Sequence, residues 1–161
     1  EQYDRLSPPF QKLVEGLRIR YHSPTLFRAG RRSGKPYPRP HGAPENVGSE
    51  VLSSQPIVRT KPTTGWKALH PGVLFAEYIK AMTDSESKTV VEKIQRLIDE
   101  SRHQLLWSWY WARPVMWDNR AVLHAATQDL DSLEPRIGWR STSIDEKPYS
   151  DPVSVTRKQA L

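Results

Sequence analysis

The residues best suited to chemistry lie in the last third of the chain, in the stretch WDNRAVLHAA. Asp118 and Asn119 are a turn signal between two apolar runs, and His124 lies on the run that follows. If that run is a strand, alternation places Arg120, Val122 and His124 on one face. A histidine on an inward face would present a ring nitrogen from a rigid element, as a metal ligand requires. The alternative is a structural histidine, which the pattern taken alone favours.

A second candidate is the stretch RIGWR, which begins twelve positions after His124. In an extended chain Arg136, Gly138 and Arg140 share one face, so two guanidinium groups flank a residue without a side chain. An inward arginine is costly unless it meets an anion, and a carboxylate satisfies it with paired hydrogen bonds. The pattern therefore indicates an acid-binding pocket with space at Gly138. Two surface arginines on an edge strand fit the pattern equally well.

Composition limits the chemistry that these residues can perform. The chain has no cysteine, which excludes disulfides, thiolate metal sites and thiol nucleophiles, so any metal must be held by histidine and carboxylate. The formal net charge of +6 favours anionic partners, either nucleic acid or small acids. No apolar run approaches the ~20 residues that span a bilayer, and no targeting signal opens the chain. We therefore expect a soluble protein.

The elements before these motifs are predicted from local signals. Ser7 and Pro8 open a helix that we predict over residues 8–19. Residues 22–54 are rich in Arg, Gly and Pro without apolar periodicity, which indicates a long loop. Residues 56–60 and 66–69 are predicted to be two strands of a hairpin.

The second half of the chain should begin with a helix and continue with strands. Thr83 and Glu86 form a capping box before a helix predicted to end near Ser101. The stretches LLWSWYW, VMWDNRAVLHAA and RIGWRSTSI are strand-prone. Several strands after helices, without regular alternation, predict a mainly β fold with helices, of the α+β class.

Several of these stretches together resemble one family. The run PIVRT-KPTTGWKAL, then WDNRAVLHAATQD, then RIGWR is similar to the signature of the taurine and 2,4-dichlorophenoxyacetate dioxygenase family, and especially to its fungal members with an APENVG loop. The resemblance covers nearly the whole chain, in order. It implies a double-stranded β-helix (jelly-roll) of the clavaminate synthase-like type, of which residues 1–161 would be the C-terminal part of a single domain.

The resemblance also implies a role for each candidate residue. His124 matches the distal histidine of an Fe(II) site built from two histidines and one carboxylate. Arg136 matches the arginine that binds the cosubstrate 2-oxoglutarate, and Arg140 matches the arginine that faces an anionic substrate. The implied reaction is the oxygen-dependent hydroxylation of a small anionic compound, such as a sulfonate or sulfate ester. The resemblance implies a small anionic substrate and oxygen as partners, and neither nucleic acid nor a membrane. A homo-oligomer is possible, and we expect a cytoplasmic location.

One departure from the family pattern is informative. The other two iron ligands come from a His-x-Asp or His-x-Glu motif, yet none of the five histidines has an acidic residue two positions later. We expect that motif upstream of Glu1, and this chain alone to be inactive. Two other readings stay open, a non-catalytic remnant that lacks the metal motif and a basic nucleic-acid-binding module.

Overall fold

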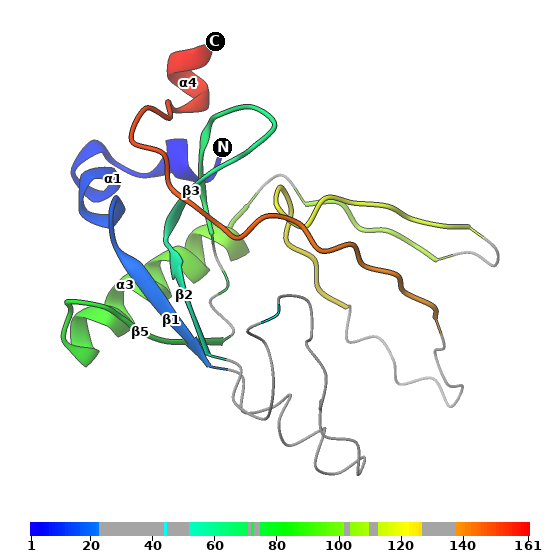
Figure 1. Cartoon of the computed structure of the whole chain (residues 1–161), viewed down its shortest axis with the longest axis horizontal. Coiled ribbons are helices and arrows are strands. Elements are labelled where there is room, and N and C mark those ends of the chain that lie inside the picture. The colour runs from blue at the N-terminus through cyan, green and yellow to red at the C-terminus, as the bar shows by residue number, and fades with distance from the viewer. Residues whose placement is uncertain are drawn as a thin grey trace. The chain divides into compact units, whose positions relative to one another are not determined.

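The computed structural model describes residues 1–22, 44, 52–70, 72, 75–101, 104–109, 113–126 and 138–161. By their internal contacts, the residues group into two units. Unit 1 comprises Glu1–Gln104 and Glu146–Leu161, and unit 2 comprises Leu105–Asp145. Figure 1 traces both along the chain.

Unit 1 is organised around the strand β1 (Arg18–His22). This strand pairs antiparallel with β2 (Leu52–Pro56) on one edge and with β5 (Ala76–Ile79) on the other. Its side chains alternate, since Ile19 and Tyr21 are buried while Arg18, Arg20 and His22 are more exposed. The sequence prediction did not include β1, and the predicted loop at 22–54 began inside it and ended inside β2. The rest of that loop lies almost wholly outside the described residues.

A second sheet follows β2 directly. The strands β3 (Val58–Thr60) and β4 (Lys67–Leu69) form the predicted hairpin, paired antiparallel with Val58 opposite Leu69. Gly65 has a φ of 69°, the left-handed conformation that glycine adopts without strain, and its N–H closes the turn onto the carbonyl of Lys61 at 2.8 Å.

The strand predicted over residues 56–60 is divided between the two sheets at Ile57. This residue is fully buried, and its backbone forms hydrogen bonds toward both sheets. Its N–H donates to the Leu17 carbonyl at 3.0 Å, and its carbonyl accepts from the His70 N–H at 2.7 Å. One predicted strand is therefore two, because its backbone changes partners at this point.

The first helix is shorter than predicted. A 3₁₀ turn, η1 (Tyr3–Arg5), precedes α1 (Pro8–Val14), which ends well before Ile19. Gly16 follows with a φ of 80°, which breaks the helix and turns the chain into β1. The prediction of a helix over 8–19 was wrong beyond Val14. The apolar spacing continues to Leu17, but the left-handed conformation of Gly16 ends the helix before it.

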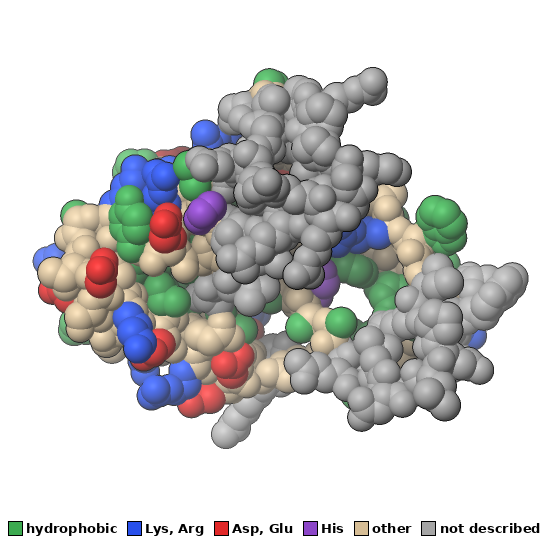
Figure 2. All heavy atoms as spheres, turned by 90° about the horizontal axis from the view of Figure 1, so that it is seen from below, with side chains coloured by type: hydrophobic (Ala, Val, Ile, Leu, Met, Phe, Trp, Pro, Cys, Tyr) green, Lys and Arg blue, Asp and Glu red, His purple; other side chains and the backbone are tan. Residues whose placement is uncertain are grey.

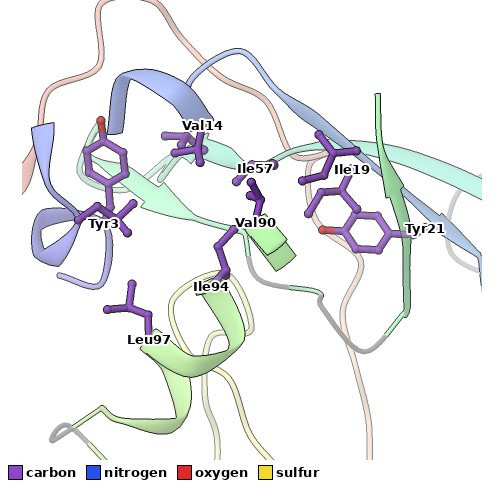
Figure 3. Packing of buried hydrophobic residues seen from close by; sticks show 11 residues of the cluster. Tyr3, Val14, Ile19, Tyr21, Ile57, Val90, Ile94 and Leu97 are labelled. Atoms are coloured by element: carbon purple, nitrogen blue, oxygen red, sulfur yellow. The ribbon is translucent and has the colours of Figure 1, made fainter. Parts of the chain in front are cut away.

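The helix α3 (Asp84–Asp99) confirms the predicted capping box. The Thr83 hydroxyl accepts from the Glu86 N–H, and the Glu86 carboxylate accepts from the Thr83 N–H. Val90, Ile94 and Leu97 are buried on the face of the helix turned toward Tyr3, Val14 and Ile57, as Figure 3 shows. The buried Ser87 hydroxyl also accepts from the Ile79 N–H at 3.1 Å, which joins the helix start to β5.

The C-terminal segment packs against the β3–β4 hairpin. The Thr60 N–H donates to the Tyr149 carbonyl at 2.8 Å, and the Lys67 N–H donates to the Val155 carbonyl at 2.8 Å. Trp66 and Val155 form an isolated parallel bridge. The chain ends in a single capped helical turn, α4 (Arg157–Ala160).

Unit 2 differs from the prediction of several strands. Its described residues, 105–109, 113–126 and 138–145, include a turn at 119–121 and no strand. Within these ranges, the backbone hydrogen bonds between described residues are the two that close this turn. Aromatic and β-branched residues favour an extended chain, but a strand also needs a neighbouring backbone to pair with. The predicted strands in LLWSWYW, VMWDNRAVLHAA and RIGWRSTSI are therefore wrong for the described residues.

The fold is of the α+β class, as the sequence predicted: antiparallel strands in two sheets, with helices from separate stretches packed on them. Within the described part of the chain, no helix has the length and apolar character needed to cross a membrane.

The core position of Ile94 leads to a stability prediction. Ile94 is 1% exposed, so Ile94→Ala should leave a cavity and lower the free energy of unfolding by about 2 to 5 kcal/mol. Chemical denaturation followed by circular dichroism measures this change. Thr89→Ala, on the exposed side of the same helix, is the control and should change stability much less. Equal losses in the two variants would contradict the packing described for α3.

Candidate functional site

The predicted turn after Trp117 is present and is closed by its own residues. The Asp118 carbonyl accepts from the N–H groups of Ala121 and Val122, at 2.9 and 3.1 Å. One oxygen of the Asp118 carboxylate accepts from the Arg120 N–H at 2.8 Å. An aspartate that bonds the backbone two residues ahead is a common way of fixing a turn.

Arg120 lies in this turn and not on a strand, so the expectation that it shares a strand face with His124 was wrong. Its guanidinium contacts two carboxylates. Nε and Nη2 lie 3.0 and 3.3 Å from the two Asp118 oxygens, and Nη1 lies 2.6 Å from Asp145 Oδ2. Arg120 keeps 28% of its side chain exposed, so this network lies at the edge of the solvent.

His124 follows the turn and is exposed. Its ring lies against that of Trp117, with the ring centroids 4.8 Å apart and the planes tilted by 57°. Trp117 is itself fixed, because its indole Nε1 donates to Asn119 Oδ1 at 2.8 Å. The turn therefore brings the chain back on itself and packs the imidazole on an anchored indole.

The described residues do not by themselves make an iron centre. An iron site of the kind implied by the resemblance needs two histidines and a carboxylate. Among the described residues, no group of three histidine or acidic side chains is close enough to hold a metal ion. Asp118, the described acidic residue nearest to His124 in sequence, is bonded to Arg120. His124 is thus a single candidate ligand.

Of the two predicted arginines, the structure describes only Arg140. Arg136 lies outside the described residues, so its position stays a prediction. Arg140 is exposed, and the described part of the chain offers it no ion pair or hydrogen bond. At Gly138, a Cβ would meet no atom within 4 Å. The residues from Gly138 to Arg140 belong to no strand, and the predicted shared face with Arg136 lies partly outside the described residues, so it stays a prediction.

Sequence reasoning missed a buried polar cluster in unit 1. Arg59 is 4% exposed, and its Nη2 bonds Glu146 Oε1 at 3.0 Å. The Thr60 hydroxyl accepts from the Asp151 N–H at 2.8 Å and lies 3.1 Å from the Ser154 hydroxyl. These bonds join β3 to the C-terminal segment. A single sequence holds no signal for such pairs, because their partners are more than 80 residues apart.

A second polar group in unit 1 surrounds Glu15. The Glu15 carboxylate accepts from the Tyr3 hydroxyl, and Lys67 Nζ lies 2.9 Å away. The hydrogen bond from Tyr3 and then the contact with Lys67 lower the pKa of Glu15, while burial and Glu15 raise the pKa of Tyr3. Glu15 and Lys67 line an open pocket with Val58 and Asp151, but they bind each other across it.

His70 is a partly buried histidine beyond the end of β4. Its ring meets the edge of the Tyr21 ring, with centroids 6.0 Å apart. Burial, and secondarily the positive charge of Arg59, lower the pKa of His70 from 6.5 to about 4. His70 is therefore neutral at pH 7, and its contacts are those of a residue that packs in the fold.

Comparison with known proteins identifies the family. The family described as "Taurine catabolism dioxygenase TauD, TfdA family" matches residues 1–142. The chain is a member of the TauD/TfdA family. The match includes the turn at 118–121, His124, and the arginines at 136 and 140.

The fungal TauD/TfdA relatives align over essentially the whole chain. An alpha-ketoglutarate-dependent dioxygenase of Aspergillus oryzae, oryG, is 42% identical over 164 residues, which cover 100% of this chain and 48% of that protein. A putative alpha-ketoglutarate-dependent sulfonate dioxygenase of Schizosaccharomyces pombe is 33% identical, over 99% of this chain and 38% of that protein. The chain thus spans less than half the length of these relatives.

One solved structure aligns with part of the chain. The structure of a putative alpha-ketoglutarate-dependent taurine dioxygenase from Burkholderia xenovorans aligns with 60% of this chain and 27% of that chain, at a TM-score of 0.43 and 23% identity. Membership of the TauD/TfdA family rests on the family match and the fungal relatives.

The environment of His70 predicts how stability depends on pH. Its pKa is lower in the folded protein, so the unfolded chain binds a proton first as the pH falls. This contribution to stability should be present above pH 6.5 and lost progressively between about pH 6.5 and 4. His70→Asn, which cannot titrate, should lose less stability over this range.

The measurement is the denaturation midpoint of both proteins at a series of pH values. His22→Asn, at the end of β1, is the matched control and should behave like the parent chain. Parallel pH curves for the parent and His70→Asn would show that His70 is not buried as described.

Proposed function

We propose that this chain forms part of an Fe(II)- and 2-oxoglutarate-dependent dioxygenase that hydroxylates a small anionic compound, with sulfonates or sulfate esters as the substrate class. The observation that carries the proposal is the exposed imidazole of His124, packed on Trp117 behind a fixed turn, in a TauD/TfdA family member. Relatives described as sulfonate and sulfate ester dioxygenases support the substrate class.

His124 would supply one of the iron ligands. The ring is accessible, and the contact with Trp117 limits its rotation, which lowers the entropy lost on binding a metal. Iron would supply the activation of oxygen. The described residues bring together no group of three possible ligands, so the proposed centre needs a second histidine and a carboxylate beside His124.

The arginines would bind the two anions of the reaction. Arg136 is proposed for the distal carboxylate of 2-oxoglutarate, and Arg140 for the anionic group of the substrate. Arg140 is exposed and has no ion pair with a described residue, so it could bind an incoming anion without first losing a protein partner. The space beside Gly138 leaves room for a ligand near Arg140.

We propose the jelly-roll as the fold of the complete domain. Large apolar side chains of unit 2 are strongly exposed, including Leu105 at 83%, Met116 at 97% and Trp139 at 100%. Extended segments with such side chains are suited to pair with further strands and to bury this surface. Such pairing would account for the strand-prone stretches of unit 2, which form no ladder among the described residues.

A non-catalytic member of the family is the competing proposal, and one observation favours it: no histidine of the chain is followed two positions later by an acidic residue. We do not propose a nucleic-acid partner. Among the described side chains that Figure 2 colours, basic and acidic ones are interspersed. Salt-dependent DNA binding by the chain would overturn this view.

The role of His124 is tested by turnover. The chain is compared with a version extended upstream through any His-x-Asp or His-x-Glu motif in its coding sequence, and carbon dioxide released from 2-oxoglutarate is measured with added Fe(II). The extended version should be active and Glu1–Leu161 alone inactive. His124→Ala in the extended version should abolish turnover, because a metal ligand is lost, while His22→Ala should not.

Two results would contradict this assignment. Near-normal consumption of 2-oxoglutarate by His124→Ala would remove His124 from the metal site. Absence of any turnover or Fe(II) binding by an extended version that contains the motif would favour the non-catalytic member.

The division of labour between the arginines is tested by titration of the extended version. Arg136→Lys keeps the charge but loses the paired geometry, so binding of 2-oxoglutarate should weaken by ~1 to 3 kcal/mol, more than that of the substrate. Arg140→Ala should weaken the substrate more than 2-oxoglutarate. Lys80→Ala, outside unit 2, is the control. If both arginine variants raised only the apparent constant of the substrate, this division would be wrong.

A further inference from the structure

Asp145 makes a contact that the sequence motifs did not indicate. Its Oδ2 lies 2.6 Å from Nη1 of Arg120, so it joins the segment that carries Arg140 to the turn that precedes His124. Asp145 follows Arg140 by five positions, and His124 follows Arg120 by four. The ion pair therefore lies close in sequence to both proposed binding residues.

Neutralising Arg120 does not require Asp145. Asp118 already meets the guanidinium with both oxygens, at 3.0 and 3.3 Å, through Nε and Nη2. A bidentate carboxylate satisfies the charge of an arginine. The guanidinium is a rigid fork, so Nη1 points in a direction set by the other two contacts. Asp145 bonds Nη1 and so connects its own segment to the turn that contains Arg120.

The residue after Asp145 is anchored as well. Glu146 bonds Arg59, whose side chain is 5% exposed, at 3.0 Å. Two consecutive acidic residues thus each bind an arginine, Asp145 within unit 2 and Glu146 within unit 1.

We propose that Asp145 is a positioning residue: its ion pair with Arg120 ties the segment carrying Arg140 to the turn before His124, and so sets the spacing between the metal ligand and the substrate-binding arginine. The roles of His124 and Arg140 rest on the proposed function. The connection made by the Arg120–Asp145 ion pair, called the tie below, does not.

The tie can be measured as a distance in the chain as it stands. The chain has no cysteine, so Ala125→Cys and Ser141→Cys, both at exposed positions, introduce the only sites for spin labels. Electron double resonance should give a narrow distribution of distances. Asp145→Asn should broaden it, Asp145→Glu should restore it, and Glu92→Gln, which removes a carboxylate from an exposed ion pair on α3, should leave it unchanged.

High salt provides a second arm of the same measurement. Because the network is partly exposed, 1 M salt (a Debye length of ~3 Å) should broaden the distribution in the parent and add little in Asp145→Asn. A distribution in Asp145→Asn identical to that of the parent would overturn the proposal, whatever the chain's activity.

The consequence for binding is tested in the extended version. Asp145→Asn should raise the apparent constant of the anionic substrate by about two- to fivefold, the size expected for a partly exposed ion pair, with a smaller effect on kcat. Asp145→Glu should recover most of it. A broadened distance with unchanged constants would overturn the positioning role. A parent that does not turn over would refute the proposed function, and the distance measurement would still decide the tie.

Discussion

The backbone of Ile57 joins the two sheets of unit 1. Its N–H is bonded to Leu17, just before β1, and its carbonyl to His70, just after β4. A buried backbone must have both groups satisfied, and here each is satisfied by a different sheet. The side chain of Ile57 is fully buried in the core shared with α3, as Figure 3 shows. The two sheets and the helix therefore meet at one residue.

Unit 2 is organised differently, by polar contacts within a short stretch. Asp118 fixes the turn, Asn119 holds the indole of Trp117, and that indole supports His124. These contacts are local, so they can form without a surrounding sheet. This explains how a candidate ligand can have a defined environment in a unit whose described residues contain no strand.

The parts of the fold that sequence could predict are those specified by neighbouring residues. The α3 capping box, the β3–β4 hairpin and the turn at Asp118 each depend on residues within a few positions of one another. The division of one strand at Ile57 and the bond between Arg59 and Glu146 depend on partners far away in the chain, which a single sequence does not reveal. The role of His124 as a metal ligand comes from the resemblance and stays a proposal, since the described residues bring together no group of three possible ligands.

Solvation separates the arginines that hold the fold from those that could bind a ligand. Arg59, with 5% of its side chain exposed, has lost its water and must be paired, and Glu146 pairs it. Arg120 is intermediate in exposure and meets two carboxylates. Arg140 is exposed, and among the described residues none pairs with it. An exposed arginine stays hydrated, so the fold bears no desolvation penalty for its charge. It can exchange that water for a carboxylate or sulfonate. Pairing and burial, which only a structure gives, therefore separate arginines that look equivalent in the sequence.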